Sequence, residues 1–140
     1  MILDLTYEEY FPQPIEEVWR ALTDREMLGA WLMQSDDFEP VTGKSFTLRC
    51  PPGADWDGVV RVEVLDVEAP RRMVWSWFDG VRGRGPSRVS FELLPDGAGT
   101  RLLLRHQGDS DDGQGARVRA GWPGKLDALR AVVLSRVRHS

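Results

Sequence analysis

The segment 121-GWPGKLDALRAVV-133 decides the fold, because it predicts the one long helix of the chain. Its apolar residues recur at i, i+4, i+7 and i+11 and so share one helical face: Trp122, Leu126, Leu129 and Val133. Pro123 suits the first turn of such a helix. The strands predicted upstream form a sheet with one apolar face, and only this helix is long enough to cover it.

Upstream of this helix, apolar residues alternate with polar ones, as expected for strands with one buried face. The strand positions predicted to face inward are Phe46, Leu48, Val60, Val62, Val64, Met73, Trp75, Trp77, Val89, Phe91, Leu93, Leu102, Leu104 and His106. Turn signals separate these strands at 50-CPP-52, 70-PR-71 and 95-PDGAG-99. We therefore expect a five-stranded meander between residues 45 and 106, followed by a polar loop from Gln107 to Gly115.

The N-terminal part predicts one further strand and two short helices. Ile2–Phe11 alternates as a strand, and Pro14 is well placed to open a helix. The apolar stripe of that helix is Ile15, Val18, Trp19 and Leu22. The segment 23-TDRE-26 predicts a capping box in which Thr23 is the N-cap of a second helix. The second helix would bury Met27, Leu28, Trp31 and Leu32.

These elements predict an α+β helix-grip fold in a single domain, residues 1–140. A curved antiparallel sheet of about six strands would wrap around the long C-terminal helix, with two short helices after the first strand. Such a wrap commonly leaves a cavity between sheet and helix. The alternative is that large side chains fill this space.

Composition excludes several classes of protein. The chain has 140 residues and a net charge of −4, which argues against nucleic acid as a partner. No apolar run approaches the ~20 residues of a membrane-spanning helix, and the N-terminus lacks the pattern of a secretory signal. We expect a cytoplasmic protein that does not insert into membranes.

Charge is unevenly distributed along the chain. Residues 1–40 hold two arginines against ten acids, whereas residues 117–140 hold five arginines and one lysine against one acid. Either the two ends lie near each other, or they form separate docking or anion-binding faces.

Few residues offer catalytic or metal-binding chemistry. Cys50 is the only cysteine, which excludes an internal disulfide and a cysteine-based metal site. His106 is the one candidate for an acid–base group, and a hydrogen-bonded structural histidine is the alternative. The acids Asp109, Asp111 and Asp112 suit a solvated loop better than a cation site. We expect no metal ion and no cofactor.

The aromatic content is the most informative feature, with six Trp, five Phe and two Tyr. Large aromatic side chains around an apolar space suit a flat hydrophobic ligand, because they offer wide contact area at low entropic cost. The residues predicted to line a ligand site are Trp31, Phe46, Met73, Trp75, Trp77, Phe91, His106, Trp122 and Leu126. The loops Asp79–Pro86 and Gln107–Gly115 could act as lids.

Several segments together resemble a known superfamily. They are 14-PIEEVWRALTD-24, Trp31, 70-PRRMVWSW-77, 99-GTRLLLRHQG-108 and 121-GWP-123 with Leu126 and Leu129. In this order they resemble the START/polyketide-cyclase-like (SRPBCC, Bet v 1-like) superfamily. Within it, they are similar to the branch of homologues of the activator of heat-shock protein 90 ATPase.

The resemblance implies the helix-grip fold and leaves three functions open. Superfamily members include lipid carriers, polyketide cyclases, hormone receptors and co-chaperone domains, so fold alone does not choose among them. Some small members resemble self-resistance proteins that bind a reactive enediyne product. The leading hypothesis is binding of an apolar aromatic, lipid-like or polyketide-like molecule. The alternatives are a protein-interaction or co-chaperone-like module, and a cyclase- or hydrolase-type enzyme that uses His106.

Overall fold

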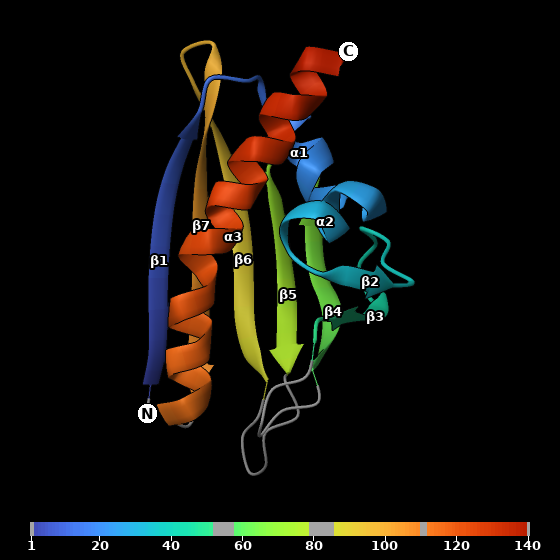
Figure 1. The fold of residues 1–140 in the computed structure, drawn as a ribbon, viewed down its shortest axis with the longest axis vertical. Helices are drawn as coiled ribbons and strands as arrows, with labels where there is room; N and C mark the ends of the chain where they lie inside the picture. Colours follow the sequence, from blue (N-terminus) through green and yellow to red (C-terminus); the bar gives the residue numbers. More distant parts are fainter. Residues whose placement is uncertain (1, 52–57, 79–85, 110–111, 140) are drawn as a thin grey trace.

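The computed structural model describes residues 2–51, 58–78, 86–109 and 112–139. Its elements, in chain order, are β1 (Ile2–Phe11), α1 (Ile15–Thr23), α2 (Arg25–Trp31), β2 (Gln34–Asp36), β3 (Ser45–Arg49), β4 (Val59–Glu68), β5 (Arg72–Phe78), β6 (Ser87–Asp96), β7 (Gly99–Asp109) and α3 (Asp112–His139). The described strands form one seven-stranded antiparallel sheet in the order β1-β7-β6-β5-β4-β3-β2 (Figure 1). The predicted α+β helix-grip class is confirmed.

One strand pairing joins the two ends of the chain. Strands β2 to β7 follow one another as a meander, whereas β1 pairs with β7 at the far edge of the sheet. The register aligns Leu5 with His106 and Ile2 with Asp109. The N-terminal strand therefore lies beside the last strand, close to the helix that follows it.

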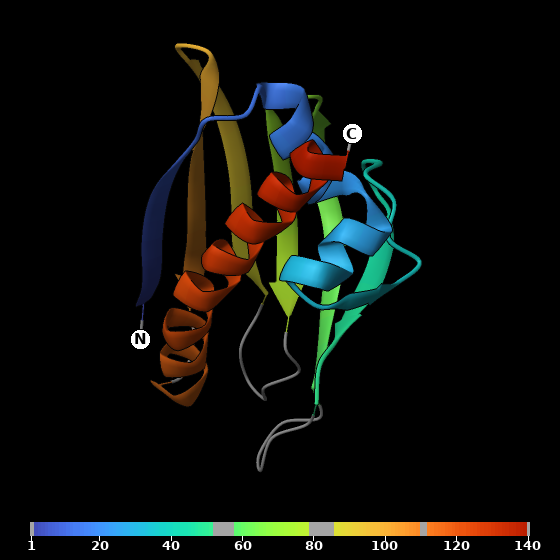
Figure 2. The ribbon, with the colours of Figure 1, turned by 45° about the horizontal axis from the view of Figure 1, so that its top comes forward.

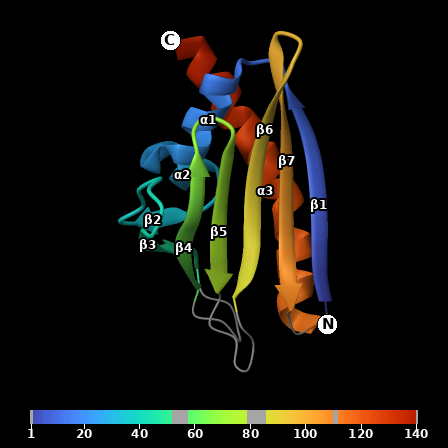
Figure 3. The ribbon, with the colours of Figure 1, turned by 180° about the vertical axis from the view of Figure 1, so that it is seen from behind.

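The helices cover one face of the sheet. Figure 2 shows α3 running diagonally across that face, with α1 and α2 beside its C-terminal half. Figure 3 shows the opposite face, which no described helix covers. The main core of the protein is therefore the layer between the sheet and the three helices.

The predicted stripe of α3 faces the sheet as expected. Trp122, Leu126, Leu129 and Val133 are all buried. The inward positions of the predicted strands are buried as well, from Phe46 on β3 to Leu104 on β7. Period-two strands and a period-3.6 helix thus form one continuous core.

The predicted capping box at Thr23 is wrong by one residue. Asp24 is the N-cap of α2, and its carboxylate accepts a hydrogen bond from the Met27 backbone N–H at 3.1 Å. Thr23 is still part of α1, and its hydroxyl donates to the Trp19 carbonyl at 2.8 Å. A single residue separates the two helices, so the last residue of α1 is not available as a cap. Met27 is half-buried rather than buried.

The predicted loop from Gln107 to Gly115 is also wrong. Strand β7 continues to Asp109 and α3 begins at Asp112, so Pro123 lies inside the helix rather than in its first turn. The polar end of β7 is a strand because β1 supplies a partner: Gly108 aligns with Leu3 and Asp109 with Ile2, and beside them Gln107 Nε2 donates to Asp4 Oδ1 at 3.2 Å. The side chains of Asp109, Asp111 and Asp112 lie outside the described part of the structure.

The sheet has one strand more than predicted. The additional strand, β2, has three residues and pairs with β3, with Ser35 opposite Leu48. It is too short to show an alternating pattern, which is why the sequence does not predict it. The predicted lid Asp79–Pro86 lies outside the described residues, apart from Pro86.

Candidate ligand-binding interior

The residues predicted to line a ligand site all meet in the layer between the sheet and the helices. Their exposed fractions are between 0 and 5%, for Trp31, Phe46, Met73, Trp75, Trp77, Phe91, His106, Trp122 and Leu126. The residues therefore lie together as predicted. In this structure their side chains pack against one another and are nearly inaccessible to solvent. Their role in binding remains a prediction.

A first group of rings surrounds Trp75 on β5. The Trp75 ring contacts Phe91 on β6 and Phe46 on β3, with centroids 4.9 and 5.4 Å apart. Phe38 lies 6.0 Å from Trp75 and 4.8 Å from Phe46, and Trp31 of α2 meets Phe91 edge-on at 6.3 Å. All these contacts are edge-to-face, the geometry that aromatic quadrupoles favour.

A second group surrounds Trp77, two residues further along β5. The Trp77 ring lies 5.4 Å from the His106 ring on β7 and 5.7 Å from the Trp122 ring on α3. His106 and Trp122 are 5.9 Å apart. This group joins the centre of the sheet to the covering helix.

A buried chain of hydrogen bonds fixes the state of His106. The Trp122 indole N–H donates to His106 Nδ1 at 3.0 Å, so this nitrogen carries no hydrogen. His106 Nε2 therefore donates to Ser87 Oγ, 2.6 Å away, and the Ser87 hydroxyl donates to the Trp77 carbonyl at 3.2 Å. Burial lowers the pKa of His106 to about 4, so the ring is neutral at pH 7.

This arrangement limits what His106 can do as a base. The lone pair that would take a proton, on Nδ1, already accepts from Trp122. The low pKa adds a further obstacle, because an efficient general base has a pKa near the operating pH. The observed geometry is that of a structural histidine that ties β7, β6 and α3 together.

Side chains along α3 hold the helix over this interior. Besides the bond from Trp122, Lys125 donates to the Leu32 carbonyl at 2.8 Å, and Arg130 donates to the Tyr10 carbonyl at 2.8 Å. Burial lowers the pKa of the Lys125 ammonium. The Arg130 guanidinium also pairs with Glu9 and lies over the Phe11 ring. The acidic N-terminal strand and the basic C-terminal helix thus lie side by side.

Phe38 belongs to this interior, although no pattern in the sequence predicts it. It lies between β2 and β3, in a stretch without helix or strand, and is 1% exposed. Asp37 before it has a positive φ of 71°, and Arg25 Nε donates to the Phe38 carbonyl at 2.7 Å. A period-based analysis misses Phe38 because no regular element carries it. The one available signal is a large aromatic residue within an acidic, polar segment.

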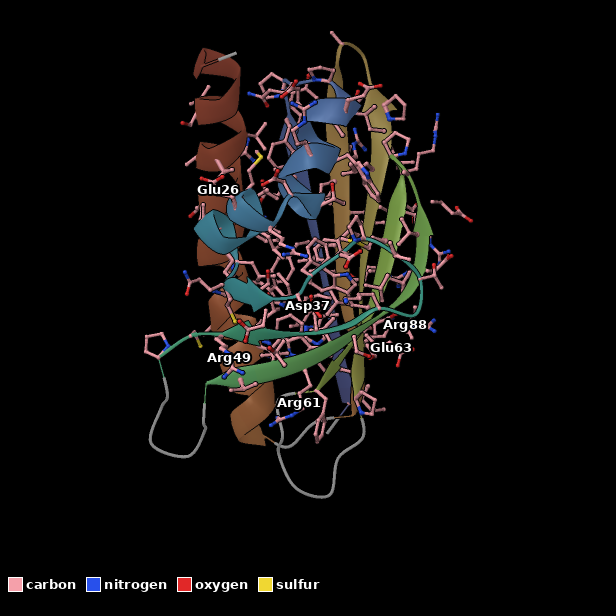
Figure 4. All side chains as sticks on the ribbon, turned by 90° about the vertical axis from the view of Figure 1, so that its right-hand side faces the viewer. Glu26, Asp37, Arg49, Arg61, Glu63 and Arg88 are labelled. Carbon is pink, nitrogen blue, oxygen red and sulfur yellow. The ribbon has the colours of Figure 1, made fainter. Side chains whose placement is uncertain are left out.

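Of the described surface grooves, one reaches a member of the ring groups, Phe46. This groove, of about 690 Å³, lies mainly on the sheet face opposite α3, where its walls include Arg61, Glu63 and Phe78. Figure 4 shows Glu63 and Arg88 on that side of the sheet. A second groove, of about 530 Å³, runs between α2 and α3, and a third, of about 620 Å³, runs between α2 and β2, where Glu26 and Arg49 contribute.

The described residues contain no cluster of three or more histidine, cysteine or acidic side chains arranged to hold a metal ion. Among the described helices, none combines the length and the apolar character needed to cross a membrane.

Comparisons with solved structures agree with the fold. Protein MLL2253 from Mesorhizobium loti is similar with a TM-score of 0.81 and 30% identity, over 95% of this chain and 97% of that chain. CalU16 from Micromonospora echinospora is similar with a TM-score of 0.76 and 26% identity, over 97% and 79%. DynU16, a protein in the dynemicin biosynthetic locus, shares the fold with a TM-score of 0.75 and 23% identity, over 91% and 46%. Comparison with curated proteins finds no match.

The family comparison covers most of the chain. Residues 12–133 match the family described as Activator of Hsp90 ATPase homolog 1-like protein. The matched range begins just after β1 and ends at Val133, the last residue of the buried stripe on α3. The chain therefore belongs to the Activator of Hsp90 ATPase homolog 1-like family, within the SRPBCC, Bet v 1-like superfamily.

Proposed function

We propose that this domain binds an apolar, ring-containing small molecule, aromatic, lipid-like or polyketide-like, between the sheet and α3. The observation that carries the proposal is the composition of this layer. Two groups of aromatic rings, around Trp75 and around Trp77, follow one another along β5. An aliphatic layer would fill the same space, whereas aromatic rings also offer faces and edges for a flat ligand.

Binding requires the rings to part. The predicted lining residues are nearly inaccessible, so a ligand enters by moving α3 or the segment that carries Phe38. The ligand would then replace ring–ring contacts with contacts of the same kind. The exchange is favourable because the ligand's own apolar surface leaves water.

The relatives suggest a setting for such a ligand. DynU16 has the same fold and belongs to the dynemicin biosynthetic locus. We extend the proposal to natural-product metabolism or self-resistance on this basis.

Trp77→Phe tests the proposal, with Trp19→Phe as the matched control. Trp77 belongs to the second ring group, whereas Trp19 is a half-buried residue of α1 at the edge of the core. With fluorene as the probe, we expect Trp77→Phe to raise the Kd about three- to tenfold, since one aromatic contact contributes roughly 0.5–1.5 kcal/mol. Trp19→Phe should leave the Kd unchanged. Equal affinities for wild type and a folded Trp77→Phe variant would contradict the proposal.

The two alternatives have less support. A docking function would use the acidic N-terminal part and the basic C-terminal helix, but Glu9 and Arg130 of these two regions pair with each other. A cyclase- or hydrolase-type function would need His106 as a base, and both of its nitrogens are already engaged. Neither alternative rests on an observation comparable to the aromatic layer.

A further inference from the structure

The Trp75 indole N–H is a buried donor without a partner. Trp75 is 0% exposed, and its Nε1 atom has no hydrogen-bond partner. Other indoles of the same interior are satisfied: Trp31 Nε1 donates to the Ala21 carbonyl at 2.9 Å, and Trp122 Nε1 donates to His106 Nδ1 at 3.0 Å. Trp75 is therefore as deeply buried as Trp31 and Trp122, but its indole N–H has no hydrogen-bond acceptor.

An unpaired donor at this depth is unfavourable unless something accepts from it. Buried polar groups in native proteins are nearly always hydrogen-bonded, so each exception calls for an explanation. A phenylalanine at position 75 would fill the ring layer without leaving such a group. An acceptor on a bound ligand would satisfy the indole N–H and remove its cost.

The ring neighbours of Trp75 offer no oxygen or nitrogen acceptor on their side chains. They are Phe38, Phe46 and Phe91, at 6.0, 5.4 and 4.9 Å between ring centroids. An N–H contact with an aromatic face is weaker than a hydrogen bond to oxygen. A ligand oxygen would therefore be preferred over these rings.

The same surroundings specify the charge of the acceptor. None of these three ring neighbours carries a charge, so a carboxylate or phosphate at this point would be desolvated without a counter-ion. A neutral carbonyl oxygen accepts a hydrogen bond and carries a far smaller desolvation penalty. The rest of the molecule must be flat, because the walls are aromatic rings.

Phe38 marks where the ligand would enter. It packs on both Phe46 and Trp75 from a segment, residues 37–44, that has no helix or strand. Asp37 holds a positive φ of 71°, a backbone conformation that is uncommon for residues other than glycine. Outward movement of this segment would free the position of the Phe38 ring beside the Trp75 indole.

We propose that the ligand is a planar aromatic molecule with a neutral ring carbonyl, which accepts a hydrogen bond from Trp75 Nε1 in the place vacated by Phe38. This inference rests on the proposed function and narrows it to one ligand class. In this inference, Trp75 Nε1 is the atom that selects ligands with a carbonyl group.

A matched pair of probes tests it. Fluorene and fluorenone have nearly the same flat three-ring shape, and only fluorenone has a carbonyl. Dissociation constants for both are measured with wild type, Trp75→Phe and the control Trp19→Phe. The ratio of the two constants within one protein is compared across variants, which cancels the difference in hydration between the probes.

For wild type we expect a preference for fluorenone that Trp75→Phe reduces about tenfold, the effect of one buried hydrogen bond. Trp19→Phe should keep the wild-type ratio. In wild type, fluorenone should move the Trp75 indole proton downfield and lower the carbonyl stretching frequency, and fluorene should leave that proton nearly unmoved. These two spectroscopic readouts stand even where Trp75→Phe fails to fold.

The outcomes separate the two proposals. If both probes bind wild type, and Trp75→Phe keeps the same ratio or the indole proton stays in place, the carbonyl inference is overturned and the proposed function stands. If neither probe binds wild type, the proposed function fails and the inference fails with it.

Discussion

The neutral state of His106 has a measurable consequence for stability. Its pKa is about 4 in the folded protein, against an ordinary value of 6.5. The unfolded chain therefore binds more protons between these values, and the free energy of unfolding falls as the pH drops from about 6.5 towards 4. Above about pH 6.5 the histidine is neutral in both the folded and the unfolded state, so this loss of stability is absent there.

We expect the free energy of unfolding to fall by about 2 kcal/mol between pH 7 and pH 5, from the linkage of one group with this shift. His106→Gln should remove that part of the pH dependence, because an amide does not titrate in this range. Denaturant unfolding at both pH values measures the effect. The same slope in wild type and His106→Gln would show that His106 is not its source.

Some of the residues that form the interior can be predicted from the sequence, and others cannot. The inward position of His106 and the aromatic face of β5 follow from period two, and both are observed. The partners of His106 do not follow, since Ser87 and Trp122 reach it from β6 and α3. Phe38 is missed because its position depends on a loop conformation, including the positive φ of Asp37.

At the scale of elements, the contact between β1 and β7 depends on one glycine. A Cβ atom at Gly99 would lie 2.6 Å from Tyr10 Oη and closer still to the Phe11 carbonyl. At Gly121 in α3, nothing lies within 4 Å of the added atom. The two glycines therefore offer a matched pair of substitutions.

Gly99→Ala should destabilise the fold by about 2 kcal/mol or more, because the end of β1 must shift away from β7. Gly121→Ala should stabilise it by up to about 1 kcal/mol, since alanine is the better helix former. Thermal or denaturant unfolding of both variants measures these changes. A neutral Gly99→Ala would mean that the two strands do not approach as closely as the structure has them.

An element can be predicted from the sequence when its own residues show a periodic pattern, and not when it forms only by pairing with another strand. Strands β3 to β6 and the buried stripe of helix α3 are predicted by the regular spacing of apolar residues within each segment. The last residues of β7, Gly108 and Asp109, pair with β1, which lies about a hundred residues away along the chain. Strand β2 pairs with β3 but has only three residues, too few to show a periodic pattern. The start of α3 is missed for a similar reason, because its apolar stripe begins only at Trp122.

At the scale of the molecule, the acidic N-terminal strand and the basic C-terminal helix lie side by side. The pairing of β1 with β7 brings the acidic N-terminal strand beside α3, where Glu9 pairs with Arg130, and Glu8 pairs with Arg101 of β7. The first of the two predicted explanations, proximity of the two ends, is therefore the observed one. The fold class and the family were accessible from the order of motifs, whereas the ligand was not, because one fold serves many functions.

The most direct test of the central claim locates a ligand inside the protein. Isotope-labelled protein is titrated with fluorene and fluorenone, and nuclear Overhauser effects are recorded between probe protons and protein side chains. We predict saturable shifts and intermolecular contacts with the rings of Trp77 and Phe91, between the sheet and α3. Contacts confined to the surface grooves, or no saturable shift with either probe, would contradict binding in the interior.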